Sequence, residues 1–140
     1  MKRVVYTGGT FDLFHAGHVT FLRAARALGD ELVVAVNSDE FAGRYKRRPV
    51  MSYDERVYVL NACRFVDRVV LNVGDEDSGI SIAQVCPQAI VIGDDWRNRD
   101  YLGQLGIDQA FLDALGATII YLPYTQNVST SDIIQRIQSR

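Results

Sequence analysis

The sequence has few of the residues that most often carry redox or metal chemistry. Its 140 residues include only two cysteines and two histidines. Cys63 and Cys86 lie in apolar segments and do not form a CxxC pair. This spacing argues against a disulfide framework or a zinc knuckle, and it predicts two buried free thiols.

Long hydrophobic runs are also missing. The longest span only a few residues, as at 32–36, whereas a helix needs about 20 apolar residues to cross a bilayer. Residues 1–6 lead directly into a strand-like segment, without the apolar region and small-residue cleavage site of a signal peptide. We therefore expect no membrane-spanning segment and a cytoplasmic location.

The charges of the chain nearly balance. There are 15 Lys and Arg residues and 17 Asp and Glu residues, which gives a formal net charge of −2. This balance argues against an electrostatic nucleic-acid binder. A hydrophobic content of 48% in 140 residues predicts one domain with a sizeable core.

Short β-branched runs alternate with longer helical patterns along the chain. The runs are apolar on both faces, which is typical of buried strands in a parallel sheet with crossover helices between them. The sequence therefore predicts a single-domain α/β fold with a doubly wound, Rossmann-like, five-stranded parallel sheet and helices on both faces. The predicted strands are Arg3 to Thr7, Glu31 to Val36, Arg68 to Leu71, Ala89 to Ile92 and Thr118 to Leu122.

Apolar residues at helical spacing separate these strands. The stripe over 19–28 predicts a helix that ends at Gly29. Ser52 and Glu55 match a capping box, which predicts the start of a second helix. The polar stretch 93–106 follows a strand, where loops of α/β sheets form the ligand crevice. Weaker helical patterns cover 81–85, 108–115 and 131–137, the last capped by Ser129 or Thr130.

The segment between the first strand and the first helix carries the main chemical signal. It reads GGTFDLFHAGH over residues 8–18. Glycines there let backbone amides approach a phosphate, and the helix N-terminus adds partial positive charge. His15 and His18 stand at the start of the helix, so both imidazoles can face one ligand. Neither GxGxxG nor GxxxxGKS/T is present, which excludes the usual dinucleotide and P-loop sites.

Residues 9–18, with the sequence HAGH, resemble the HxGH signature of the nucleotidyltransferase superfamily. Later segments are similar to successive motifs of its cytidylyltransferase branch, and most of all to glycerol-3-phosphate cytidylyltransferases. These segments are DEF at 39–41, SYDER at 52–56, GDDW at 93–96 and VSTSDII at 128–134. The resemblance covers almost the whole chain, so we expect residues 1–140 to form one nucleotidyltransferase domain.

The resemblance implies transfer of a nucleotidyl group from a triphosphate to a phosphate monoester, with release of pyrophosphate. The acceptor oxygen is already negatively charged, so catalysis would consist of alignment and charge stabilisation at the α-phosphorus, without a covalent intermediate. Mg²⁺ would be carried by the triphosphate and would need few protein ligands. The implied partners are CTP and a small phosphate monoester, by default glycerol 3-phosphate, and the implied assembly is a homodimer.

The same resemblance implies roles for individual residues. The catalytic groups would be His15, His18 and Lys46. The acceptor would contact Asp12, Asp39 and Arg47. The nucleotide would contact Gly9, Thr10, Phe11, Gly17, Asp94, Trp96, Thr125, Ser129 and Thr130.

Several of these residues also have structural interpretations. Asp12 could be a turn residue and Asp39 a cap after the second strand. Asp94 could contact the base edge or hold its own loop. Trp96 could belong to the core, although its place after GDD matches the base-binding tryptophan of the family. Arg56 is interpreted as a structural residue at the start of a capped helix.

The cations RYKRR at 44–48 depart from the family pattern, which has lysines flanking a single residue. Four cations within five positions of an acidic protein suit a triphosphate and an anionic acceptor. We assign Lys46 to the phosphates, with Arg47 as a substitute. The segment 97–116 is also longer than in short bacterial relatives, which could reshape the acceptor pocket.

A second departure concerns the family motif RTEGxST. Tyr124 stands where that motif has its arginine, so a bidentate phosphate contact is lost. Either Arg97 or Arg99 compensates, or the nucleotide is held differently.

These observations leave three functional hypotheses. The leading one is a CTP-dependent cytidylyltransferase that makes a CDP-alcohol, because Trp96 after GDD favours cytidine. The altered arginine position keeps open an ATP-dependent adenylyltransferase that acts on a sugar phosphate or a cofactor phosphate. A non-catalytic nucleotide-binding module is a further alternative, against which the intact HAGH and VSTS segments argue.

Overall fold

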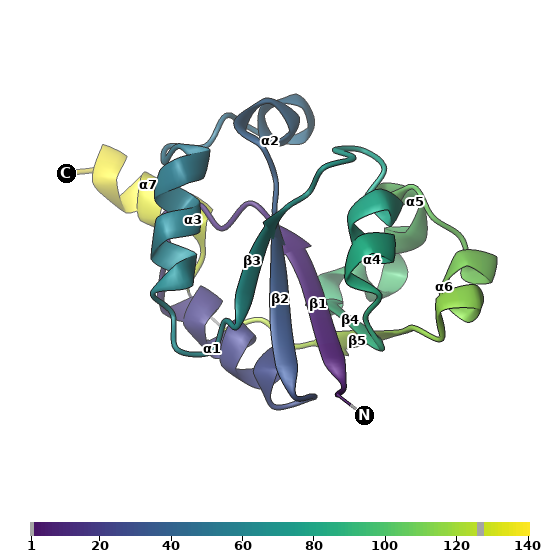
Figure 1. The fold of residues 1–140 in the computed structure, drawn as a ribbon. Coiled ribbons are helices and arrows are strands. Elements are labelled where there is room, and N and C mark those ends of the chain that lie inside the picture. The colour runs from purple at the N-terminus through teal and green to yellow at the C-terminus, as the bar shows by residue number, and fades with distance from the viewer. Residues whose placement is uncertain (1, 126–127) are drawn as a thin grey trace.

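The computed structural model describes residues 2–125 and 128–140. Its centre is a five-stranded sheet with the order β3-β2-β1-β4-β5, seen in Figure 1. Each neighbouring pair of strands is parallel, so the predicted fold class is confirmed. The strands are β1 (Val4–Gly9), β2 (Glu31–Val36), β3 (Arg68–Leu71), β4 (Ala89–Gly93) and β5 (Thr118–Leu122).

Helices cover both faces of the sheet (Figure 1). One face carries α1 (Ala16–Arg26), α3 (Tyr53–Asn61) and α7 (Thr130–Gln138). The other face carries α4 (Gly79–Val85), α5 (Tyr101–Leu105) and α6 (Gln109–Leu115). Two short helices, α2 (Asp39–Tyr45) and the 3-10 helix η1 (Asp94–Asn98), follow the carboxyl ends of β2 and β4.

The short helices are where the sequence prediction was incomplete. Residues 93–106 were predicted to be irregular, but they contain η1 and α5. The helix α2 was not predicted. Side-chain caps define these elements, since Ser38 accepts a hydrogen bond from the amide of Phe41 and Asp100 accepts one from Gly103. Helices of seven and five residues are too short to display a hydrophobic period.

The residues of β1 alternate between two hydrophobic cores. Val5 packs with Leu22 of α1 and Leu60 of α3, whereas Tyr6 packs with Ile82 of α4 and the residues of α5 and α6. Strands β2 and β3 are added on one side of β1, whereas β4 and β5 are added on its other side, so the strand order reverses there. In open α/β sheets, ligands bind outside the carboxyl ends of the strands at such a reversal.

Two other sequence predictions can be compared with the structure. Cys63 is partly buried, but Cys86 is exposed, so the prediction of two buried thiols is wrong for Cys86. Cys86 ends α4 in a left-handed conformation at the surface, with a φ of 53°. No helix within the described residues is long and apolar enough to cross a membrane.

Arg56 is a buried cation that ties together the segments at the carboxyl end of the sheet. Its guanidinium donates hydrogen bonds to the carbonyls of Thr10 (2.7 Å) and Met51 (3.1 Å) and to the carboxylate of Asp39 (2.7 Å). The side chain of Arg56 is fully buried and that of Asp39 is 23% exposed. Burial opposes the charge of Asp39, but the hydrogen bonds from Arg56 and the Tyr53 amide, together with the charges of Arg56 and Arg48, outweigh it and lower the pKa of that carboxyl. The structural interpretation of Arg56 therefore agrees with its contacts.

Replacing Arg56 tests how much this cluster contributes. Arg56→Met should lower the free energy of unfolding by about 3 kcal/mol, the low end for breaking a buried ion pair, because Asp39 keeps some contact with water. Asp39→Asn, the matched control, keeps an acceptor oxygen and should cost less. Urea unfolding measures both variants. A loss below about 1 kcal/mol for Arg56→Met, the range of an exposed pair, would contradict this role.

Candidate active site

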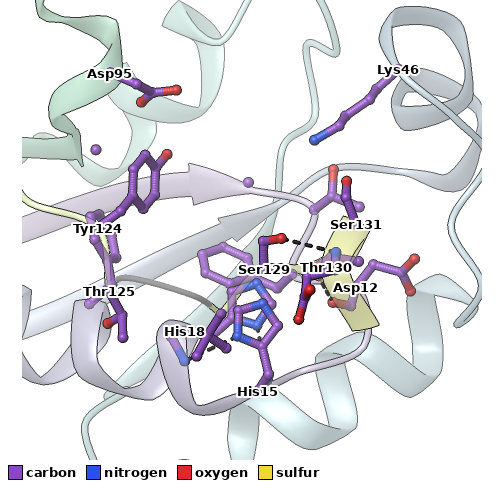
Figure 2. A pocket seen from close by; sticks show the side chains of 18 of the residues that line it. Asp12, His15, His18, Lys46, Asp95, Tyr124, Thr125, Ser129, Thr130 and Ser131 are labelled. Atoms are coloured by element: carbon purple, nitrogen blue, oxygen red, sulfur yellow. Dashed lines mark hydrogen bonds between the residues drawn. The ribbon is translucent and has the colours of Figure 1, made fainter. Parts of the chain in front are cut away.

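A cleft of about 660 Å³ opens at the carboxyl end of the sheet. Its walls come from the end of β1, the start of α1, the end of α2, the end of β4 and the segment between β5 and α7 (Figure 2). The structure brings most of the predicted site residues to this cleft. They are Gly9, Thr10, Phe11, Asp12, His15, Gly17, His18, Lys46, Arg47, Thr125, Ser129 and Thr130.

The two histidines form the N-terminal cap of α1. Nδ1 of His15 accepts a hydrogen bond from the amide of Gly17, and Nδ1 of His18 accepts one from the amide of His15, both at 3.1 Å. A neutral imidazole that accepts at Nδ1 carries its proton on Nε2. The cap therefore fixes the tautomer of both rings and leaves each with an Nε2–H donor.

The surroundings of the histidines favour their neutral form. Burial lowers the pKa of His15. Burial and the neighbouring His15 lower the pKa of His18 to about 3, against a smaller opposite effect of Asp12. The two rings stack with their centroids 3.8 Å apart, and Phe14 stacks on His18 at 5.3 Å. At neutral pH both side chains are thus uncharged donors in fixed positions.

Glycine is needed where the loop and the helix pack closely. A Cβ atom at Gly17 would lie 2.9 Å from the His15 ring, and one at Gly9 would lie 3.0 Å from the Phe11 ring. Phe11 and Leu13 have left-handed backbone conformations, with φ values of 56° and 49°. The loop between β1 and α1 is therefore tightly bent and strained.

The N-terminus of α7 faces the same cleft (Figure 2). The Ser129 hydroxyl caps this helix by accepting a hydrogen bond from the amide of Asp132 at 3.0 Å. The Thr130 hydroxyl donates to the carbonyl of Asp12 at 3.0 Å and so joins α7 to the loop after β1. Because α1 and α7 both begin here, their dipoles make the cleft favourable for anions.

Two cations from the segment after α2, Lys46 and Arg47, also line the cleft. Figure 2 shows the ammonium group of Lys46 pointing toward the cavity. A guanidinium nitrogen of Arg47 lies 3.4 Å from the Ser131 hydroxyl. Nε of Arg47 and the hydroxyl of Thr125 are buried and have no hydrogen-bond partner within residues 2–125 and 128–140. Unpaired buried polar atoms are costly, so both atoms are suited to contact a ligand.

The carboxylates predicted to bind the acceptor have structural partners instead. Asp12 lines the cleft, but it is 6% exposed, and its oxygens accept hydrogen bonds from the amides of Val50 (2.8 Å) and Met51 (2.9 Å). Asp39 is held by Arg56 and accepts a hydrogen bond from the amide of Tyr53 at 3.3 Å. Both contacts support the structural alternative, and Asp39 does not line the cleft.

The predicted base contacts at Asp94 and Trp96 lie outside this cleft as well. Trp96 packs against Tyr101 of α5, with ring centroids 5.4 Å apart, and belongs to the core of the opposite face. The reason is the tight turn of η1, which directs Trp96 toward α5. Asp95, which no motif in the sequence singles out, lines the cleft in their place.

Tyr124 forms the wall opposite the cations. Its ring lies directly against Gly93, so that any side chain at Gly93 would overlap it, and it stacks on Phe21 at 6.4 Å. Its hydroxyl points toward Asp95 (Figure 2). Burial, together with the charge of Asp95 and a hydrogen bond to it, raises the pKa of Tyr124 to about 12. In the sequence, this wall is indicated by Tyr124, which stands where the family motif has an arginine.

The two arginines considered as substitutes for that arginine do not line the cleft. Arg97 lies over the ring of Tyr121 at 5.2 Å, and Arg99 lies over Trp96 at 5.5 Å. Both contacts are cation–π interactions outside the cleft. The structure thus favours the alternative in which the nucleotide is held differently.

Known proteins are similar to this chain in sequence over nearly its whole length. The chain is 43% identical over 141 residues to bifunctional protein HldE of Shewanella denitrificans, a match that covers 99% of this chain and 28% of that protein. The protein of the same name from Shewanella amazonensis gives the same identity and coverage. The chain therefore spans about 28% of the length of these relatives.

A solved structure and a family model give the same result. The crystal structure of the lipopolysaccharide core biosynthesis protein from Thermoplasma volcanium GSS1 has a TM-score of 0.74 and 27% sequence identity, and it covers 91% of this chain and 100% of that one. The family model described as cytidylyltransferase-like matches residues 6–136. Since this match includes the HxGH segment, the cleft and nearly the whole fold, the chain belongs to the cytidylyltransferase-like family of nucleotidyltransferases.

Proposed function

We propose that this chain transfers the adenylyl group of ATP to the phosphate of a sugar, forming an ADP-sugar and pyrophosphate. One observation carries the reaction class: uncharged imidazole donors and the N-termini of α1 and α7 converge on one cleft. Arg47 and Thr125 add buried polar atoms that have no partner among the described residues. Such a cleft is suited to a polyphosphate.

The reaction needs no covalent bond to the protein. An oxygen of the acceptor phosphate attacks the α-phosphorus of ATP, and the bond between that phosphorus and the oxygen bridging to the β-phosphate breaks. The departing pyrophosphate takes the electron pair. The Nε2–H groups of His15 and His18 would donate hydrogen bonds to the phosphate oxygens, where negative charge increases in the transition state. Lys46 would act as a point charge on the same oxygens.

The described residues offer no preformed metal centre. In the part of the chain that the structure describes, no group of three or more His, Cys, Asp or Glu side chains could hold a metal ion. Asp12 is a carboxylate whose charge acts on His18, and two backbone amides already occupy its oxygens. We therefore treat Mg²⁺ as part of the substrate, bound by triphosphate oxygens and water.

Two observations favour ATP and a sugar phosphate over the CTP and glycerol phosphate predicted from the sequence. The relatives are HldE proteins, and the similar solved structure is a lipopolysaccharide core biosynthesis protein. A lipopolysaccharide core is built from sugars, which are incorporated in nucleotide-activated form. Trp96, the residue that favoured cytidine, lies outside the cleft. CTP remains the second candidate because the family description names cytidylyl transfer.

A matrix of substrates tests the proposal. Pyrophosphate release should be fastest with ATP and a sugar phosphate when ATP, CTP, GTP and UTP are each combined with hexose phosphates, a heptose phosphate and glycerol 3-phosphate. Mass spectrometry of the product should identify an ADP-sugar. Release that depends on CTP and glycerol 3-phosphate would restore the cytidylyltransferase hypothesis, and no release in any combination would favour the non-catalytic module.

His18 should serve the chemical step as well as the helix cap. His18→Ala should lower kcat by about 100- to 1000-fold, because a fixed donor to the transition state is lost. It should also cost about 1 kcal/mol of stability, because the cap is lost. His18→Gln is the matched control, since glutamine is a normal partner in a capping box. It should preserve the thermal unfolding temperature while kcat stays low. Near-normal turnover in either variant would contradict the proposed role.

The wall formed by Tyr124 should bind the base. Tyr124→Ala should raise KM for ATP about tenfold or more, because stacking of a base on an aromatic ring is lost, while kcat changes less. Trp96→Phe is the control outside the cleft and should leave KM for ATP unchanged. Steady-state kinetics at saturating acceptor separates these effects. If Trp96→Phe raised KM for ATP and Tyr124→Ala did not, the base site predicted from the sequence would be correct.

A further inference from the structure

A second cavity lies on the other side of β1 from the histidines. It has a volume of about 100 Å³ and is lined by residues of β1, the loops after β2 and β3, η1 and α5. We call it the Tyr6 cavity. Its lining residues are Tyr6, Gly8, Gly9, Asn37, Phe41, Asn72, Ser78, Ile92, Trp96, Tyr101, Gln104 and Leu105.

Tyr6 is the unusual member of this lining. It is 1% exposed, yet no hydrogen bond joins its hydroxyl to another residue that the structure describes. A Cβ atom at Gly8 would lie 3.7 Å from this hydroxyl, which locates it beside the central strand. Burial alone raises the pKa of the phenol above its ordinary value. The hydroxyl is not among the fully enclosed polar atoms that lack a partner, so it can be reached from the cavity and is available to bond to a ligand there.

The other walls combine polar side chains with aromatic rings. Asn72 is 3% exposed, and its amide donates to the side chain of Asn37 at 3.1 Å. Trp96 and Tyr101 form an aromatic wall, and Gln104 of α5 adds an exposed amide. Apolar walls with a few fixed polar groups are typical of pockets for small polar molecules. Three of the lining residues, Tyr101, Gln104 and Leu105, belong to α5, within the segment 97–116 that the sequence predicts to shape the acceptor pocket.

The Tyr6 cavity adjoins the nucleotide cleft. Gly8, Gly9 and Ile92 line both spaces. The two glycines have no side chain that would fill the passage at the end of β1. A molecule whose phosphate lies in the cleft near the histidines can therefore extend past the glycines toward Tyr6. The acceptor needs such a place, since Asp12 and Asp39 are held by protein groups.

We propose that the Tyr6 cavity binds a hydroxyl-bearing arm of the acceptor sugar, with the Tyr6 hydroxyl hydrogen-bonded to a sugar hydroxyl. This inference rests on the proposed function and names the part of the acceptor that is selected. A volume of about 100 Å³ accommodates about three water-sized groups. It suits a short exocyclic chain with hydroxyls and is too small for a complete sugar ring. The cavity would thus distinguish sugars by their exocyclic carbons.

Tyr6→Phe tests the inference because it removes only the hydroxyl oxygen. KM for a heptose phosphate should rise about 2- to 12-fold, the effect of one lost neutral hydrogen bond, while KM for ATP stays unchanged. The thermal unfolding temperature of the free protein should stay the same, because the substitution removes no hydrogen bond between Tyr6 and another described residue. The matched control is Tyr58→Phe, since Tyr58 is 79% exposed on α3. It should change neither quantity.

The acceptor provides a second comparison. With a hexose phosphate that lacks the terminal carbon of the heptose, Tyr6→Phe should have no effect on KM. An unchanged KM for the heptose phosphate in Tyr6→Phe would overturn the inference and leave the proposed function intact, as would a lower unfolding temperature, which indicates a structural partner. If the wild-type protein used glycerol 3-phosphate and no sugar phosphate, the proposed function and this inference would both be wrong.

Discussion

The loop between β1 and α1 is the constraint on which the rest of the cleft depends. Its backbone is held by hydrogen bonds from Arg56 to the carbonyl of Thr10 and from Thr130 to the carbonyl of Asp12. The carboxylate of Asp12 in turn fixes the amides of residues 50 and 51. Segments far apart in the sequence, at the starts of α3 and α7, are thereby fastened to one short turn. These hydrogen bonds can offset the conformational strain of the left-handed residues in the loop. They also hold the backbone amides of the loop in place before a ligand binds.

Most of the fold could be predicted because its signals are local. The strands are continuous apolar runs, and the start of α3 is marked by Ser52 and Glu55, whose reciprocal hydrogen bonds are present. The helix α5 could not be predicted in the same way. Its five residues are ordered by a cap from Asp100 and by burial of Tyr101 and Leu105 against the sheet. Such tertiary contacts leave no periodic pattern in the sequence.

The sequence indicates which residues gather at one cleft, but it does not indicate the direction of each side chain. The HAGH segment and the residues at 129–130 lie together because the ends of parallel strands share one edge of the sheet. For Trp96 and Asp95, adjacent positions in η1, the sequence does not indicate which one faces the cleft. The same holds for Tyr6, which resembles any core residue of a buried strand until the lack of a partner for its hydroxyl is seen.

The cap of α1 has a consequence for how this protein can change. Ser, Asp and Asn are the residues that best begin a helix, yet positions 15 and 18 hold histidines that line the cleft, whose Nδ1 atoms cap the helix and whose Nε2–H groups remain free to donate. A substitution that improves the cap at position 15 removes the donor on the opposite side of the same ring. Selection for thermostability alone would therefore erode this site, and engineering of the chain should leave the first turn of α1 unchanged.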